Sequence, residues 1–181
     1  MCVFSQPLFL FSAHPLLNSV AIALLLESTL LLQPTSSNTP KAKRTGAIVH
    51  SILNMTAFLA MYAAFIVMIV NKAQHHGNHF ESAHARLGLI TYILIFLQVT
   101  VGMVQFYFPS LVGGEERAKA IYKYHRISGY VIFLFISMTA IAVTYTPYIA
   151  ITYFYLPTWF VLLCLAFVLS GVIARVNPRK L

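Results

Sequence analysis

The sequence predicts an all-α membrane protein, a multi-pass bundle of five transmembrane helices. Of its 181 residues, 59% are hydrophobic and only 9% are charged, whereas a soluble domain carries about 25% charged residues. Five stretches are long and apolar enough to cross about 30 Å of hydrocarbon as helices. They run over residues 13–32, 47–70, 82–108, 122–145 and 152–173.

These spans divide the chain into three regions. Residues 1–12 form a non-cytoplasmic stub that is too short to span a membrane and lacks the basic residues of a cleavable signal peptide. Residues 13–174 form one membrane domain, and residues 175–181 form a basic tail. Polar, turn-rich segments are expected to separate the spans, at 33–45, 71–81, 109–118 and 146–151.

The basic residues gather on one side of the predicted bundle. Ten of the twelve Lys and Arg residues fall in the first loop, in or beside the third loop, or in the tail. Only Lys72 and Arg86 fall on the other side. By the positive-inside rule, the first loop, the third loop and the C-terminus are cytoplasmic. The net charge of +8 is thus explained by membrane topology, and we expect no nucleic-acid partner.

One histidine stands at the N-terminal end of each of the first four spans: His14, His50, His84 and His125. Because consecutive spans alternate in direction, the first and third histidines lie near one membrane face and the other two near the opposite face. Ionisable residues inside a membrane are costly and tend to be functional. Neutral imidazole on both sides of a haem iron gives an electron-transfer site with no vacancy for oxygen. The pattern therefore predicts two haems, and without a C-x-x-C-H motif these are non-covalent.

Other interpretations of the histidines are weaker. A zinc site needs ligands that converge on one point, whereas helix direction separates these histidines into two groups. An arrangement with both histidines on one helix, thirteen or fourteen residues apart, is disfavoured because those positions hold other residues. The remaining alternative is a non-redox transporter or packing subunit whose histidines bind protons or headgroups.

A short internal repeat supports the pairing. The first two histidines are each followed by x-x-Leu-Asn, and the other two by a glycine four residues on, Gly88 and Gly129. Each predicted pair takes one helix of each kind. Because residue i+4 lies one turn along the same helix face, glycine there removes a side chain that would collide with a flat macrocycle.

The segments around the histidines resemble the cytochrome b561 family. They read Ser-Ala-His-Pro at 12–15, His-Phe-x-Ser-x-His-x-x-x-Gly at 79–88 and Tyr-His-x-x-Ser-Gly-Tyr at 124–130. The resemblance covers roughly residues 11–173 and is strongest to stand-alone domain proteins of that family. It implies a six-helix bundle whose central four helices hold two b-type haems, with the ligand pairs His14/His84 and His50/His125. The family's peripheral first helix has no counterpart among the five expected spans.

The resemblance also implies an activity. Family members pass electrons by outer-sphere transfer from cytoplasmic ascorbate to monodehydroascorbate or a ferric chelate across the membrane. The chain is therefore expected to be a transmembrane ascorbate-dependent oxidoreductase. A homodimer is compatible with this expectation. Its expected location is an endomembrane (vacuole, endosome or vesicle) or the plasma membrane.

Substrate residues follow from the same resemblance and from charge. Arg44 and Lys119 match the family's ascorbate site, and Lys123 lies beside them, near helix N-termini that attract anions. His79 matches a position near the outer substrate, and the neighbouring His75 and His76 offer a site for ferric iron. An ordinary topological role for the basic residues, and an exposed polar loop for the histidines, remain the alternatives.

Overall fold

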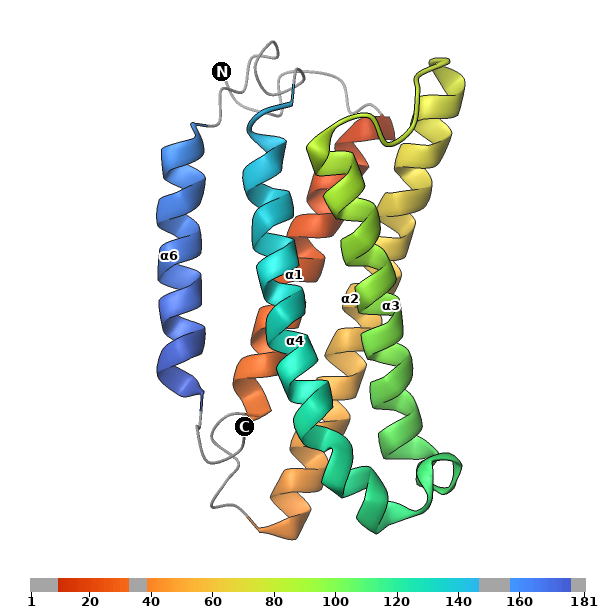
Figure 1. Ribbon diagram of the computed structural model, residues 1–181, viewed down its shortest axis with the longest axis vertical. Coiled ribbons are helices and arrows are strands. Elements are labelled where there is room, and N and C mark those ends of the chain that lie inside the picture. The colour runs from red at the N-terminus through yellow and green to blue at the C-terminus, as the bar shows by residue number, and fades with distance from the viewer. Residues whose placement is uncertain (1–9, 33–38, 147–156, 177–181) are drawn as a thin grey trace.

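The computed structural model describes residues 10–32, 39–146 and 157–176, and these are helical apart from turns (Figure 1). Five helices are long and apolar enough to span a membrane, so the chain is a multi-pass membrane protein, as predicted. They are α1 (Ala13–Leu32), α2 (Pro40–Gln74), α3 (Ala83–Tyr107), α4 (Glu115–Val143) and α6 (Thr158–Arg175). Two short 3-10 turns, η2 (Leu10–Ser12) and η4 (Pro109–Val112), precede α1 and α4.

Two helices begin well before the apolar spans predicted for them. Helix α2 starts at Pro40, so residues 40–45, expected in a loop, are helical. The Thr39 hydroxyl caps this start, and proline suits the first helical turn because its missing N–H would have no helical partner there. Helix α4 starts at Glu115 rather than at residue 122. The negative charges of Glu115 and Glu116 stabilise this start, because the N-terminal end of a helix carries a partial positive charge. The basic residues of both regions therefore stand on helices rather than in loops.

The other predicted boundaries shift less. Helix α2 continues to Gln74, four residues into the expected loop at 71–81, and Ser82 caps α3 at its predicted start. The expected loop at 109–118 is reduced to η4 and two glycines, Gly113 and Gly114, whose positive φ angles permit the tight turn. The predicted start of the last span at residue 152 lies outside the described residues, and its helix is described from Thr158.

The core lies between the first four helices. Helices α1 and α2 pack along one another, as do α3 and α4, and α2 also contacts α3. Alanines at 21, 57 and 64 are fully buried and let the helix backbones approach closely. The central buried cluster consists of Ala21, Leu25, Ala57, Met61, Ile95, Ile132 and Ile136.

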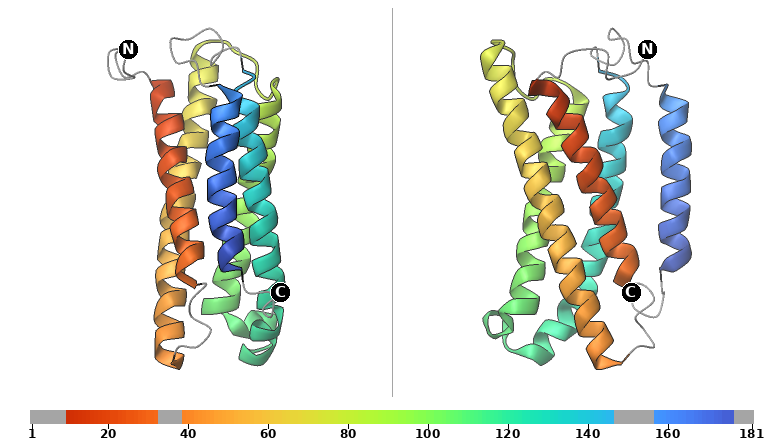
Figure 2. Two further views of the ribbon diagram at one scale, coloured as in Figure 1. Left: turned by 90° about the vertical axis from the view of Figure 1, so that its left-hand side faces the viewer. Right: turned by 180° about the vertical axis from the view of Figure 1, so that it is seen from behind.

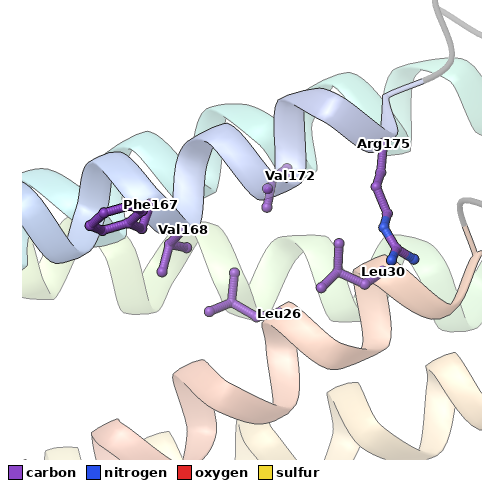
Figure 3. Close-up of a pocket in the computed structure, with 7 residues that line it drawn as sticks. Leu26, Leu30, Phe167, Val168, Val172 and Arg175 are labelled. Carbon is purple, nitrogen blue, oxygen red and sulfur yellow. The ribbon is translucent and has the colours of Figure 1, made fainter.

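Helix α6 stands apart from the rest of the bundle in Figure 1 and in the right-hand view of Figure 2, and it touches mainly α4. A groove of about 300 Å³ separates it from α1 (Figure 3). Leu26 and Leu30 of α1 face Phe167 and Val168 of α6 across it, and Arg175 closes one end. An apolar groove with a cation at its end suits a helix surrounded by lipid, because arginine can extend its charge towards the headgroups.

The outer surface of the bundle is apolar. Ile52, Leu59 and Ile66 recur every seven residues along α2 and are all exposed. In water, such a face would lie against solvent, whereas in a bilayer it meets hydrocarbon. The end at which α2 and α4 begin is different, and we call it the basic end. It carries Lys41, Lys43, Arg44, Arg117 and Lys119.

Candidate haem-binding site

The four histidines occupy two levels of the bundle. His14 and His84 are the second residues of α1 and α3, as their predicted position at a helix start requires. His50 and His125 lie further inside their helices, each as the eleventh residue, because α2 and α4 begin at Pro40 and Glu115. The prediction that these two histidines open their helices is therefore wrong. About 15 Å of helix separates them from the helix N-termini at the basic end.

Three of the histidine rings are anchored to the main chain of a neighbouring helix. The Nδ1 atom of His14 lies 3.1 Å from the Ala64 carbonyl oxygen. That of His50 lies 2.9 Å from the Ser28 oxygen. Because a carbonyl oxygen only accepts, Nδ1 carries the proton in each case, and Nε2 of the neutral ring keeps its lone pair. A ring fixed in this way presents Nε2 as a metal ligand.

The third anchored ring is that of His84, whose Nδ1 donates to the Thr139 carbonyl oxygen at 3.0 Å. The three accepting residues share one relationship. Each lies fourteen positions beyond the histidine of its own helix: Ser28 beyond His14, Ala64 beyond His50, Thr139 beyond His125. At about 1.5 Å per residue, the two histidine levels are about 21 Å apart along the helix axes.

The N-terminal ends of α1 and α3 bring one histidine pair together. The ring centroids of His14 and His84 lie 6.3 Å apart, and the rings are perpendicular at 89°. If a haem is bound at this level, His14 and His84 would be the residues that hold its iron. Phe11 stacks on the His14 ring, with centroids 6.3 Å apart.

His50 and His125 stand at the second level, one on α2 and the other on α4. The His125 ring differs from the other three, because its buried Nδ1 atom has no hydrogen-bond partner among the described residues. It lies against Gly102 of α3, where an added Cβ would stand 2.8 Å from the ring atom Cε1. Glycine at this position makes room for the imidazole, and the sequence pattern did not single it out.

The glycines that the sequence did single out have other neighbours. A Cβ on Gly129 would lie 3.3 Å from Nε2 of Gln98, and one on Gly88 would make ordinary contact with Thr139 at 3.8 Å. Gly129 thus leaves space for the Gln98 amide. The proposed clearance for a macrocycle at these two positions stays a prediction.

The asparagines of the repeat bind the histidines that precede them. Asn18 donates to the carbonyl oxygen of His14 at 2.8 Å, and Asn54 does the same for His50 at 2.7 Å. Each asparagine also reaches a second helix: Tyr92 donates to Asn18 at 2.9 Å, and Asn54 donates to the fully buried Ser28 hydroxyl at 2.9 Å. The repeat therefore fixes the helix segment that carries each histidine.

The basic end brings the substrate candidates into one region without a shared contact. Lys119 is exposed and pairs with Glu115, one turn away, at 3.2 Å. Lys123 lies over the ring of Tyr124 at 5.0 Å. Arg44 is exposed on α2, six residues before His50. These side chains form a cationic surface.

The opposite end carries the histidine-rich loop. The Nδ1 atom of His75 donates to the Asn71 carbonyl oxygen, 2.8 Å away, and His79 packs against Phe80. Arg86 donates to the Phe80 carbonyl oxygen at 3.0 Å. The part of the chain that the structure describes holds no group of three histidine, cysteine or acidic residues suited to a metal ion. The ferric-iron site expected at His75 and His76 stays a prediction.

The described residues form a multi-pass membrane bundle with histidines at two levels. The profile of the eukaryotic cytochrome b561 family matches residues 13–149. The chain belongs to the cytochrome b561 family, as its sequence pattern predicts.

Individual relatives agree with this assignment. The transmembrane reductase CYB561D2 of Bos taurus is 34% identical over 127 residues, which cover 69% of this chain and 56% of the relative. The human protein of that name is 33% identical over the same length. The transmembrane ascorbate-dependent reductase CYB561 of Bos taurus is 27% identical over 132 residues, or 72% of this chain and 50% of the relative. The chain thus spans about half the length of these relatives, and no solved structure matches it.

Proposed function

We propose that this cytochrome b561 family member carries single electrons across a membrane through two non-covalent b-type haems. His14 and His84 hold one haem, and His50 and His125 hold the other. The observation that carries the proposal is the anchoring of the ring Nδ1 atoms of His14, His50 and His84. It leaves Nε2 of each ring free as a ligand, and the rings of the first pair lie together, with centroids 6.3 Å apart.

Each haem, when bound, supplies an iron that takes up and releases one electron without a bond to substrate. The protein's own groups set the conditions for that exchange. The carbonyl oxygens of Ser28, Ala64 and Thr139 hold three rings in fixed orientations. The register of fourteen residues keeps the two levels about 21 Å apart, and apolar side chains such as Met61 and Ile95 keep water from the space between them.

Ascorbate is the proposed donor, and the basic end is its proposed side. Relatives bear the name ascorbate-dependent reductase, and a monoanionic donor is attracted by the cations on α2 and α4. Arg44, Lys119 and Lys123 belong to this surface. We assign this end to the cytoplasm by the positive-inside rule, with a ferric chelate or monodehydroascorbate as acceptor near His79 at the other end.

Haem stoichiometry and ascorbate reduction of the purified full chain test this function. We expect two b-type haems per chain, a spectrum that ascorbate reduces, and loss of half of the haem in the variant His50→Ala. The exposed variant His75→Ala serves as the control and keeps both haems. A colourless protein from cells supplied with haem would overturn the proposal in favour of a transporter, while a coloured protein inert to ascorbate would overturn the donor alone.

A further inference from the structure

The anchoring of the histidine rings is incomplete at one of four places. His14 and His50 are each bonded to the helix that carries the other, through Ala64 and Ser28. On α3 and α4, His84 is bonded to Thr139, but the reciprocal bond of His125 is missing. The register of fourteen residues identifies where that partner belongs, because the residue fourteen positions beyond His84 is Gln98.

The side chain of Gln98 is bonded to His125 by a different route. Its Nε2 donates to the main-chain oxygen of His125 at 2.6 Å. Its Oε1 accepts from the hydroxyl of Ser128, at 2.7 Å, and the same hydroxyl lies 3.0 Å from the His125 oxygen. Gln98, Ser128 and the His125 carbonyl thus form a closed triangle between α3 and α4. Gly129 leaves the room that this triangle needs, since a Cβ there would approach the Gln98 amide to 3.3 Å.

We propose that Gln98 is a positioning residue for His125. It fixes this histidine through the main chain, whereas the other three are fixed through the ring. The inference rests on the proposed function, because it treats His125 as an axial ligand. It adds that the two ligands of this pair are held unequally: His50 by its ring, and His125 by the Gln98 amide and by contact with Gly102.

A consequence for the redox centre follows from this inequality. A hydrogen bond at Nδ1 fixes the orientation of an axial imidazole and raises its basicity. His125 has no such bond among the described residues, so release of its backbone frees the ring to move. A less firmly held imidazole donates less charge to ferric iron, and the reduction potential of that centre rises. The His14/His84 centre lies about 21 Å away along the helix axes and keeps its potential.

The variant Gln98→Met tests the proposal in the haem-loaded full chain, because methionine has a similar volume and no N–H to donate. The readouts are a potentiometric titration followed by absorbance and the low-temperature electron paramagnetic resonance spectrum of the ferric protein. We expect one of the two titration waves to shift by about tenfold in its equilibrium constant, which is about 59 mV for one electron. One of the two low-spin resonance signals should move, and the other stay.

Four further substitutions make the result specific. In a His84→Ala background, the single remaining wave should shift with Gln98→Met, and in a His50→Ala background it should not. Ser128→Ala removes one side of the triangle and should shift the same wave by less. Thr91→Val is the matched control, because it removes a hydroxyl contact of 3.1 Å between the same two helices at Thr139 and leaves His125 untouched.

The possible results separate the inference from the proposed function. A shift confined to the His50/His125 wave, or loss of that haem alone, supports the positioning role. Unchanged waves, or equal shifts of both, overturn it while leaving two bis-histidine haems in place. A wild-type chain that binds no haem overturns the proposed function itself.

Discussion

Gln98 and His125 are joined by a hydrogen bond of 2.6 Å that links the middle of α3 to α4. The bond ends on the main-chain oxygen rather than on the imidazole. Neighbouring helices in this bundle therefore hold histidines in two ways, by the ring or by the backbone. The following predictions use that distinction and the geometry around it.

Gly102→Ala should disturb the histidine pair nearer the basic end. The new methyl group would stand 2.8 Å from Cε1 of His125, closer than non-bonded carbon atoms approach, so the ring must move. Alanine favours a helix over glycine by about 1 kcal/mol, so the fold itself should not suffer. We expect loss or a changed spectrum of one haem. Gly171→Ala is the control, because nothing lies within 4 Å of its added methyl group; equal spectra for both variants would contradict the prediction.

Asn54→Leu should destabilise the bundle. The change removes donors to the His50 carbonyl oxygen and to the fully buried Ser28 hydroxyl. Each lost hydrogen bond costs about 0.5–1.5 kcal/mol, while the Ser28 hydroxyl keeps its bond to the Leu25 carbonyl oxygen. Thermal loss of the haem absorption should therefore begin at a lower temperature than in the unmodified chain. Thr56→Val, which removes a bond only to Ile52 in its own helix, should leave the midpoint nearly unchanged.

Reduction by ascorbate should slow as salt concentration rises. The basic end attracts the anionic donor over a distance that salt shortens to about 10 Å at 0.1 M. Stopped-flow absorbance at increasing ionic strength measures the rate. An uncharged reductant supplies the control, since its rate should not follow the salt. An ascorbate rate that does not change with salt concentration would contradict the assignment of the donor to the basic end.

Lys119→Gln should reduce the ascorbate rate only slightly. The Lys119 side chain is exposed, and the Glu115 carboxylate 3.2 Å away already offsets part of its attraction for an anion. Arg44→Gln should have the larger effect, because no ion pair of Arg44 occurs among the described residues. The comparison is made on second-order rates at low salt. A stronger loss in the lysine variant would reverse the ranking of the two residues.

Much of the architecture could be predicted from the sequence. Hydropathy indicates the number of spans, and their alternating direction assigns the histidines to two levels. The early starts of α2 and α4 were missed because a search for apolar spans does not detect helical turns that are rich in basic residues and exposed to water. Local signals existed, since Thr39 and Pro40 form a typical helix start and Glu115 and Glu116 suit a first turn.

The fine structure of the site could be predicted less well. The sequence alone does not show which carbonyl oxygen accepts from a ring on another helix, because that depends on helix packing and rotation. Gln98 and Gly102 were missed for the same reason, although a polar side chain inside an apolar span is a general sign of a role. The fourteen-residue offset becomes informative only once Ser28, Ala64 and Thr139 are seen as acceptors.

Helix α2 has 35 residues and is about 52 Å long at about 1.5 Å per residue, far more than the roughly 30 Å of hydrocarbon it crosses. The turns beyond the hydrocarbon form a rigid extension of the helix. Continuous helical backbone connects its cationic N-terminal end to His50. Inserting one residue between Pro40 and His50 would rotate the cationic side chains by about 100° around the helix axis, while the histidine rings kept their positions.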